Sequence, residues 1–426
     1  MSEAQRSRRA SLPGLHPMGR GLPPGFGVLW TTVAVDLLGF GIVVPLLPLY
    51  ARHLGAGPAS VGFLLAAFSA AQFVSAPLLG RLSDRVGRKP LLIVSLAGTA
   101  AASLLTGVAG SLWLLVVARL LDGASGGSVA VAQASATDMV GPDDRIRVFG
   151  LLGAAYGVGF VVGPAIGGLA ALGGARIPFY VAAGIAGVNA VVASRRLPET
   201  RPQPGPQGNA EGSVVPRESM RTVLRRISAP AVVTVMLIAS FSAFEATFAL
   251  FGQRRLGFGL AAIGAVFAMV GVVAVVVQGG LVRPLAARIG DLGCLRAGLV
   301  AECCGLVLIP TVHARVSLVL PLILITAGQS LSTPALNALV VARAGSEGRG
   351  AALGVQQALS ALARIVGPAV GGLSYELLGV GSPFFEGGLV IAGALVFSLV
   401  MRSGMTTSSR MVVETAVHRL PLSNNG

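Results

Sequence analysis

Long apolar stretches, separated by short polar connections, follow one another along most of the chain. Residues 90–137, for example, contain only two charged side chains, Arg119 and Asp122. At 1.5 Å per residue, these 48 residues would form a helix of about 72 Å, whereas the hydrocarbon core of a bilayer is about 30 Å thick. The stretch therefore predicts two membrane-spanning helices with a turn at residues 107–111.

The same arithmetic predicts an all-α membrane protein with twelve spans. Residues 148–194 divide into two spans at residues 173–176. Two further spans are less strongly marked, because residues 297–312 contain Glu302 and Pro310 and residues 382–401 contain Glu386. Six other stretches are long enough for one span each: 26–50, 54–80, 227–253, 256–282, 316–342 and 350–375.

A hydrophilic stretch divides the predicted spans into two sets of six. Residues 195–230 contain the segment RPQPGPQGNAEG and show no apolar periodicity, which is typical of a linker. We therefore expect two pseudo-symmetric six-helix bundles. The predicted parts are a cytoplasmic N-terminal tail (1–25), a first bundle (26–195), a cytoplasmic linker (196–230), a second bundle (231–402) and a cytoplasmic C-terminal tail (403–426).

The composition also indicates a membrane location. Of 426 residues, 54% are hydrophobic and 12% are charged, whereas soluble domains contain about 25% charged residues. The net charge of +15 requires no nucleic-acid partner, because 25 of the 32 basic residues fall in the tails and loops of one side and 5 in the loops of the other. Basic residues mark cytoplasmic loops. The distribution therefore predicts a multi-pass protein of the plasma membrane with both termini in the cytoplasm.

The cysteines and histidines indicate neither a metal site nor a disulfide framework. Cys294, Cys303 and Cys304 lack metal-ligand spacing, and the four histidines are scattered in predicted tails and loops. No cofactor is expected. Aromatic residues make up 5% of the chain, which argues against a broad aromatic-lined pocket.

Two nearly identical strings stand at the same place in each predicted bundle. VGPAIGGL covers residues 162–169, and VGPAVGGL covers residues 366–373, which is 204 residues later. A repeat at corresponding positions of the two halves indicates an internal duplication.

These strings and several further segments resemble the major facilitator superfamily, and within it the twelve-span drug/proton antiporters that include tetracycline exporters. GRLSDRVGRK (80–89) is similar to the superfamily signature between the second and third spans, and GVGFVVGPAIGG (157–168) to the fifth-span motif of the antiporters. DLLGFGIVVPLLPLYA (36–51) resembles their first-span motif. ARLLDGASGG (118–127) partly matches a fourth-span motif, with Asp122 where that motif has an uncharged residue. The resemblance covers nearly the whole chain and implies the fold of two six-helix bundles.

The signature between the second and third spans implies a cytoplasmic gate. Its two glycines are expected to form a tight turn in a short loop, and its basic residues also fit the rule for cytoplasmic loops. By resemblance, Asp84 would cap the N-terminal end of the eleventh span, where the helix dipole favours an anion. Arg85 or Arg88 would pair with Asp138, and these contacts would hold the cytoplasmic side shut. The residues assigned to this gate are Gly80, Asp84, Arg85, Gly87, Arg88 and Asp138.

The fifth-span motif is interpreted as a packing and bending element. Small residues let helices approach closely in lipid, and a proline beside a glycine bends an apolar span. The resemblance implies that this packing keeps an exporter from leaking, and no residue of the motif is expected to bind substrate. The residues are Gly159, Gly163, Pro164, Gly167 and Gly168.

Five charged residues inside spans are the candidates for substrate binding and proton coupling, because an ionisable group in the hydrocarbon core is costly. Asp36 and Glu245 lie deep in the opening span of their bundle, which lines the central cavity in this fold. Arg119 and Asp122 are three residues apart and share a helix face. They either form an internal ion pair or adjust the proton affinity of the acids. Arg364 either pairs with Glu245 or binds an anionic group.

These residues predict a proton-coupled secondary transporter that exports lipophilic, cationic or zwitterionic small molecules by alternating access. Substrate and proton would compete for carboxylates in a cavity of low dielectric constant. No histidine lies in a predicted span, so we expect carboxylates to carry the proton. A metabolite or sugar exporter and an uptake symporter of the same fold are the alternatives. A channel fits less well, because the buried charges are few and single.

The chain is not expected to be an enzyme. It shows no pair of nucleophile and base, no phosphate-binding loop and no metal cluster, so no catalytic residue is assigned. The expected partners are the small-molecule substrate, protons and the lipid bilayer, and the protein is expected to be a monomer.

Overall fold

The computed structural model describes residues 23, 25–140, 145–200 and 220–401, which form helices and no β-strand. The predicted tails and the middle of the predicted linker lie largely outside these residues. The first half contains α1 (Phe26–His53), α2 (Pro58–Val86), α3 (Arg88–Val108), α4 (Leu112–Ser125), α5 (Ser128–Asp138), α6 (Arg145–Ala170) and α7 (Ile177–Arg196). The second half contains α8 (Met220–Leu256), α9 (Leu260–Val276), α10 (Val282–Leu308), α11 (Val319–Leu378) and α12 (Ser382–Val400).

Ten helical segments within the described residues are long and apolar enough to cross a bilayer. The predicted turns at 107–111 and 173–176 are confirmed, because α3 ends at Val108 and α7 begins at Ile177. The predicted linker is too long at its C-terminal end. Helix α8 begins at Met220 and continues through Pro230, so residues 220–230 are helical.

The predicted fourth span is divided into two helices. α4 ends at Ser125 and α5 begins at Ser128, with Gly126 and Gly127 between them. The Gly126 N–H bonds to the Gly123 carbonyl in a tightened turn, and glycine has a poor helix propensity. The break changes the direction in which the first residues of α5 point.

The eighth span is longer than predicted, because α9 continues through a π-helical turn (Val277–Leu281) into the first residues of α10. Within α10, Gly290 has φ of 71° and ψ of 171°, which is far from helical. Only glycine adopts such a backbone conformation readily. Gly290 therefore ends one helical segment and starts the next.

Helix α11 also contains a reversal of the chain. The Gln356 side chain donates a hydrogen bond of 2.9 Å to the Asn337 side chain, although the two residues are 19 positions apart. In one straight helix they would be about 28 Å apart. The segments on either side of this reversal correspond to the predicted tenth and eleventh spans.

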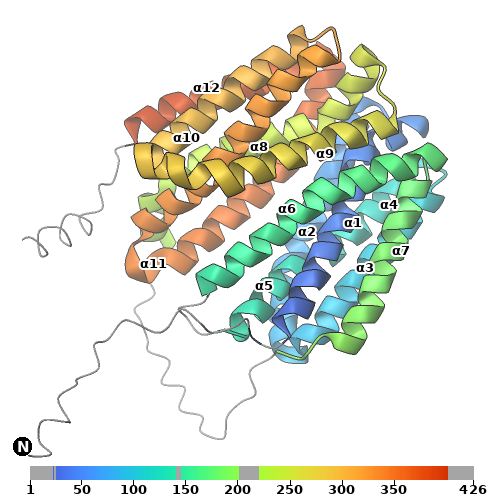
Figure 1. The fold of residues 1–426 in the computed structure, drawn as a ribbon, viewed down its shortest axis with the longest axis vertical. Helices are drawn as coiled ribbons and strands as arrows, with labels where there is room; N and C mark the ends of the chain where they lie inside the picture. Colours follow the sequence, from blue (N-terminus) through green and yellow to red (C-terminus); the bar gives the residue numbers. More distant parts are fainter. Residues whose placement is uncertain (1–22, 24, 141–144, 201–219, 402–426) are drawn as a thin grey trace, which may run out of the picture.

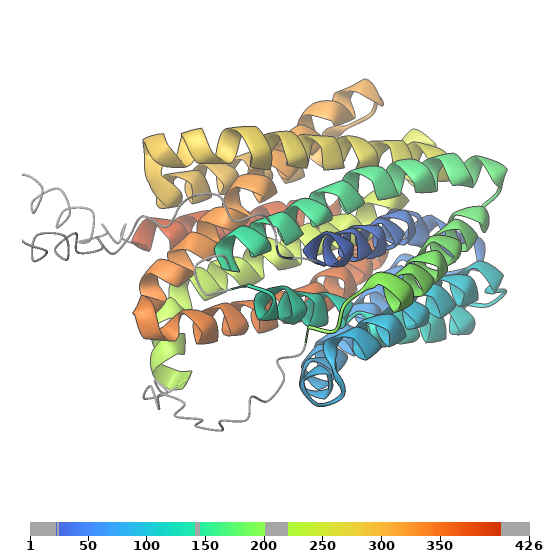
Figure 2. The same ribbon diagram turned by 60° about the horizontal axis from the view of Figure 1, so that its bottom comes forward.

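The two halves pack by the same pattern of helices. α1 packs on α6 and α7 in the first half, and α8 packs on α11 and α12 in the second. The halves meet where α2 contacts α11 and where α6 contacts α9. Figure 2 shows α6 between α1 and the gold helices of the second half. In Figure 1, α6 and α9 lie close together at the upper right and spread apart toward the lower left.

The repeated GPxxGG strings make these contacts. A methyl group added at Gly163 would come within 2.8 Å of the Gly41 Cα in α1, and one added at Gly371 within 2.9 Å of the Ala243 Cβ in α8. The last glycine of each string faces the other half. A methyl group added at Gly168 would come within 3.1 Å of the Gly264 Cα in α9, and one added at Gly372 within 3.0 Å of the Gly62 Cα in α2.

The halves are close at one end only. We call the ends of the molecule the Pro58 end and the Asp84 end, after the first and last turns of α2. At the Pro58 end, Gly62 and Gly372 bring α2 against α11. Eighteen residues further along each helix, at Gly80 and Gly354, an added methyl group would meet no atom within 4 Å. The seam between α2 and α11 therefore opens toward the Asp84 end.

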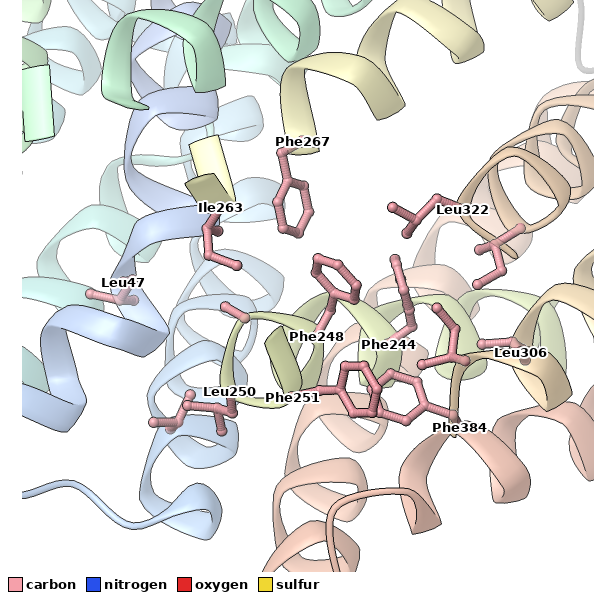
Figure 3. Close-up of a cluster of buried hydrophobic side chains, with 14 of the residues drawn as sticks. Leu47, Phe244, Phe248, Leu250, Phe251, Ile263, Phe267, Leu306, Leu322 and Phe384 are labelled. Carbon is pink, nitrogen blue, oxygen red and sulfur yellow. The ribbon is translucent and has the colours of Figure 1, made fainter. Parts of the chain in front are cut away.

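An aromatic core stabilises the second half. Figure 3 shows phenylalanine rings of α8, α9 and α12 packed together with leucines of α10 and α11. The ring centroids of Phe251 and Phe384 are 5.2 Å apart, and those of Phe248 and Phe267 are 5.8 Å apart. Leu47 of α1 lies in the same cluster, so apolar packing continues across the two halves.

The contact at Gly163 gives a stability prediction. Gly163→Val should destabilise the protein by about 1–3 kcal/mol, because the side chain would have to displace the α1 backbone. Gly153→Val in the same helix is the matched control, since Gly153 is exposed and has open space around it. Thermal unfolding of both variants in detergent measures the effect. Equal melting temperatures for the two variants would contradict this account of the α1–α6 contact.

Candidate functional site

A cavity of about 230 Å³ lies between the two halves and brings the five charged candidates together. Asp36, Arg119 and Asp122 line it from the first half, and Glu245 and Arg364 line it from the second. Helices α2, α3, α5 and α6 also contribute residues to its wall. Both halves therefore present charged groups to one cavity.

Asp36 is held by a hydrogen bond from α5. The Ser128 hydroxyl donates to Asp36 Oδ2 at 2.8 Å. Ser128 is the first residue of α5, directly after the break at Gly126 and Gly127. The break thus places a donor beside the acid, and no local sequence pattern indicates this pair because 92 residues separate them.

Arg119 and Asp122 form a buried ion pair. The Nη1–Oδ2 distance is 2.9 Å, and the side chains are 1% and 9% exposed. The Thr106 hydroxyl accepts a second hydrogen bond from Arg119 at 2.9 Å. Arg119 therefore has most of its charge compensated by groups of its own half.

Glu245 and Arg364 are arranged differently. The two residues are close enough to interact electrostatically, yet no ion pair within 4 Å joins them in the described part of the chain. Arg364 is solvent-exposed, although it lies in the middle of its helical segment. The predicted pairing of Arg364 with Glu245 is thus absent in this conformation.

Aromatic rings form much of the apolar wall. The lining includes Phe40, Phe68, Tyr156, Phe160 and Phe241. The Phe40 ring lies 5.6 Å from the Phe68 ring and 6.1 Å from the Phe160 ring, between centroids. The expectation that the cavity would have few aromatics is therefore wrong, because the fold gathers rings from four different helices.

Two glutamines add polar groups to the wall. Gln72 donates a hydrogen bond to the Gly126 carbonyl at 3.0 Å, which ties α2 to the break between α4 and α5. Gln329 also lines the cavity, and its buried Oε1 atom has no partner among the described residues.

Glu302 is a buried acid that the sequence did not single out, because it falls in a weakly marked span. Its side chain is fully buried in α10, and neither carboxylate oxygen has a hydrogen-bond partner in the described structure. The residue packs against Gly328 of α11, the neighbour of Gln329. The second half therefore holds a buried acid outside the cavity lining, and this acid has no hydrogen-bond partner among the described residues.

The predicted gate residues form a network within the first half. Arg88 bonds to Asp138 at 2.9 Å and to Asp84 at 2.7 Å, and its side chain is 10% exposed. The predicted pairing of Arg88 with Asp138 is thus present. Glu199, which the sequence did not suggest, accepts hydrogen bonds from the backbone N–H groups of Arg88 and Lys89 and so caps α3.

One expectation about this segment is wrong, and a second is not met in this conformation. Residues 80–86 belong to α2 rather than to a loop, so the turn rests on Gly87 alone, which has φ of 117°. Asp84 does not cap the eleventh span in this conformation, since it pairs with Arg88 and its side chain is 60% exposed. The open seam at the Asp84 end accounts for this difference. Arg85 is exposed in the last turn of α2.

A contact between the halves lies at the opposite end of α2. The Ala59 N–H donates a hydrogen bond of 2.9 Å to Glu376 Oε2 of α11. This places a carboxylate at the N-terminus of a long helix, where the helix dipole favours negative charge. Arg52, Arg254 and Tyr375 line a crevice beside it.

The described residues contain no group of three or more histidine, cysteine, aspartate or glutamate side chains that could hold a metal ion. The three cysteines are free. What the cavity offers chemically is therefore charge, hydrogen bonding and aromatic surface.

Comparison with known proteins identifies the family. The sequence model of the Major Facilitator Superfamily matches residues 29–368. The chain is 33% identical over 343 residues to the class G tetracycline resistance protein of Vibrio anguillarum, across 79% of this chain and 86% of that protein. It is 27% identical over 382 residues to multidrug resistance protein 1 of Bacillus subtilis (strain 168), across 88% of this chain and 96% of that protein.

The solved structure of the nucleoside transporter NupG superposes with a TM-score of 0.68 at 14% identity, over 88% of this chain and 98% of that one. At this identity the likeness shows the fold alone. The chain is a transporter rather than an enzyme, and it belongs to the Major Facilitator Superfamily.

Proposed function

We propose that this protein exports lipophilic, cationic or zwitterionic small molecules in exchange for protons. The observation that carries the proposal is the shared cavity between the halves, in which carboxylates of both halves face one aromatic-walled space. Ionisable groups at membrane depth are costly and usually serve transport. The tetracycline and multidrug resistance proteins among the relatives support the drug-efflux class.

The fold that we propose has twelve spans in two six-helix bundles, which begin with α1 and α8, with tails and linker in the cytoplasm. The breaks at Gly290 and between Asn337 and Gln356 support this count, because each divides a long helical element into two segments. The excess of basic residues supports the orientation. The Asp84 end is then the cytoplasmic end, and the protein acts as a monomer in the plasma membrane.

The proton and the substrate compete for the same carboxylates in this mechanism. Asp36 and Glu245 line the cavity from the first helix of each half. Low dielectric favours the protonated carboxyl, whereas a bound cation favours the carboxylate. A substrate cation that enters from the cytoplasm therefore displaces a proton, and a proton that enters from outside displaces the substrate.

In the proposed mechanism, the two ends of the seam between α2 and α11 open and close in turn, so that the cavity is accessible from one side of the membrane at a time. In this conformation the glycines and the Ala59–Glu376 hydrogen bond close the Pro58 end, while the seam is open beside Gly80. We propose that the Asp84 end closes when Asp84 exchanges its contact with Arg88 for one with the second half. The ion pair of Arg88 and Asp138 would keep α3 and α5 rigid during that movement.

A metabolite exporter or an uptake symporter of the same fold remains the alternative. The aromatic wall favours a lipophilic ligand over a sugar, since Phe40, Phe68 and Phe160 pack at one side of the cavity. A channel would need a continuous polar pathway, and the close glycine contacts at the Pro58 end argue against one in this conformation.

Removing the acids should uncouple transport from the proton gradient. Asp36→Asn and Glu245→Gln should each reduce drug-dependent proton movement in inverted vesicles about tenfold or more, because an amide cannot exchange a proton. Fluorescence quenching of a pH-sensitive dye measures this movement. Asp291→Asn is the control, since Asp291 is exposed outside the cavity. Full coupled exchange in both acid variants, at normal expression, would rule the proposal out.

Weakening the closed end should shift the conformational equilibrium. Glu376→Gln removes the charge that the α2 N-terminus favours, so outward-open molecules should become more populated. Spin labels at His53→Cys and Leu377→Cys, after the native cysteines are replaced by alanine, should then show a longer distance component. Glu386→Gln is the matched control, because Glu386 accepts a hydrogen bond from Ser374 within its own half. Unchanged distances in Glu376→Gln would show that the charge of Glu376 does not hold the Pro58 end closed.

A further inference from the structure

Arg364 is the one cavity arginine whose charge no neighbouring side chain compensates directly. Arg119 has Asp122 and Thr106 within 2.9 Å. Arg364 has no carboxylate within 4 Å in the described part of the chain, and its side chain is exposed in the cavity. The two cavity arginines therefore differ: the charge of Arg119 is compensated within its half, and that of Arg364 is available to a ligand.

The position of Arg364 leaves it few other partners. Leu378, where α11 ends, is 14 residues away, which is about 21 Å along a helix. An arginine side chain is too short to reach the lipid headgroups from that depth by extending along the helix. The charge must be satisfied by water in the cavity or by a ligand.

The groups that face Arg364 are themselves ionisable. Glu245 of α8 and Tyr156 of α6 are close enough to interact electrostatically with Arg364, and Tyr156 also interacts with Asp36. The cavity lining thus holds two carboxylates and a guanidinium that has no ion-pair partner among the described residues. A purely cationic ligand would find partners at the acids and none at Arg364.

The geometry points to amphoteric substrates, and we propose that Arg364 binds their anionic group. A guanidinium offers planar, paired N–H donors that fit a carboxylate or a similar planar oxyanion. Asp36 and Glu245 would accept the ligand's basic group, and the rings of Phe40, Phe68 and Phe160 would cover its apolar body. The inference rests on the proposed function, because it assumes that this cavity binds the exported molecule.

A pair of dyes that differ at one group tests the assignment. Rhodamine 110 is a zwitterion with a free carboxylate, and rhodamine 123 is its methyl ester and a simple cation. Fluorescence polarisation with purified protein in neutral detergent measures binding of each. We expect the wild-type protein to bind rhodamine 110 more tightly than rhodamine 123. Arg364→Gln should weaken the affinity for rhodamine 110 about tenfold or more and change the affinity for rhodamine 123 by less than about twofold.

Two further variants keep the result interpretable. Arg364→Lys retains the charge without the planar fork and should recover part of the affinity for rhodamine 110. Arg288→Gln, an exposed arginine of α10 outside the cavity lining, should bind both dyes as the wild type does. Each variant must elute as a single peak in size-exclusion chromatography before it is compared.

Several outcomes would overturn the inference. If Arg364→Gln weakened the binding of both dyes equally, Arg364 would act through the general electrostatics of the cavity and would not recognise the carboxylate. If Arg364→Gln changed the affinity for neither dye, Arg364 would have no role in recognising an anion. The same conclusion would follow if the wild-type protein bound neither dye or preferred rhodamine 123. The binding assay is independent of the proton gradient, so failure of proton coupling in vesicles would count against the proposed function and leave this selectivity result standing.

Discussion

A charged side chain at membrane depth must be compensated by a partner or by a water-accessible cavity, because the hydrocarbon core solvates it poorly. The cavity between the halves shows both solutions. Arg119 and Asp122 compensate each other at 2.9 Å, and Asp36 accepts a hydrogen bond from Ser128. Glu245 and Arg364 come from the second half, and no ion pair joins them among the residues that the structure describes. The groups available to a ligand or a proton are those that the fold leaves incompletely compensated.

The same fold must also let the two halves move relative to each other. Glycines bring α2 against α11 and α6 against α9, and such contacts depend on backbone shape rather than on interlocking side chains. Helices that meet through smooth surfaces can separate and close again with little repacking. The hydrogen bond between Ala59 and Glu376 adds a polar contact at the closed end. The open end, beside Asp84, has its ion pairs within one half.

Much of this arrangement could be predicted from the sequence, for physical reasons that differ between residues. A charge such as Asp36 or Arg364 stands out in an apolar span, and the duplicated strings indicate equivalent places in the two halves. Contacts between distant residues gave no such signal. Ser128 reaches Asp36 because two glycines break the fourth span, and Glu376 reaches α2 across 317 residues. Helical residues before Gly87 were assigned to a loop, because a run of charge resembles a polar connection.

In the proposed mechanism, substrate and protons compete for the cavity carboxylates. Calorimetric titration of rhodamine 123 into purified protein, in two buffers of different ionisation enthalpy, measures proton release upon binding most directly. The account predicts binding heats that differ between the buffers in the direction of proton release, and a difference that vanishes when Asp36 and Glu245 are both replaced by their amides. Identical heats in both buffers for the wild-type protein would contradict it.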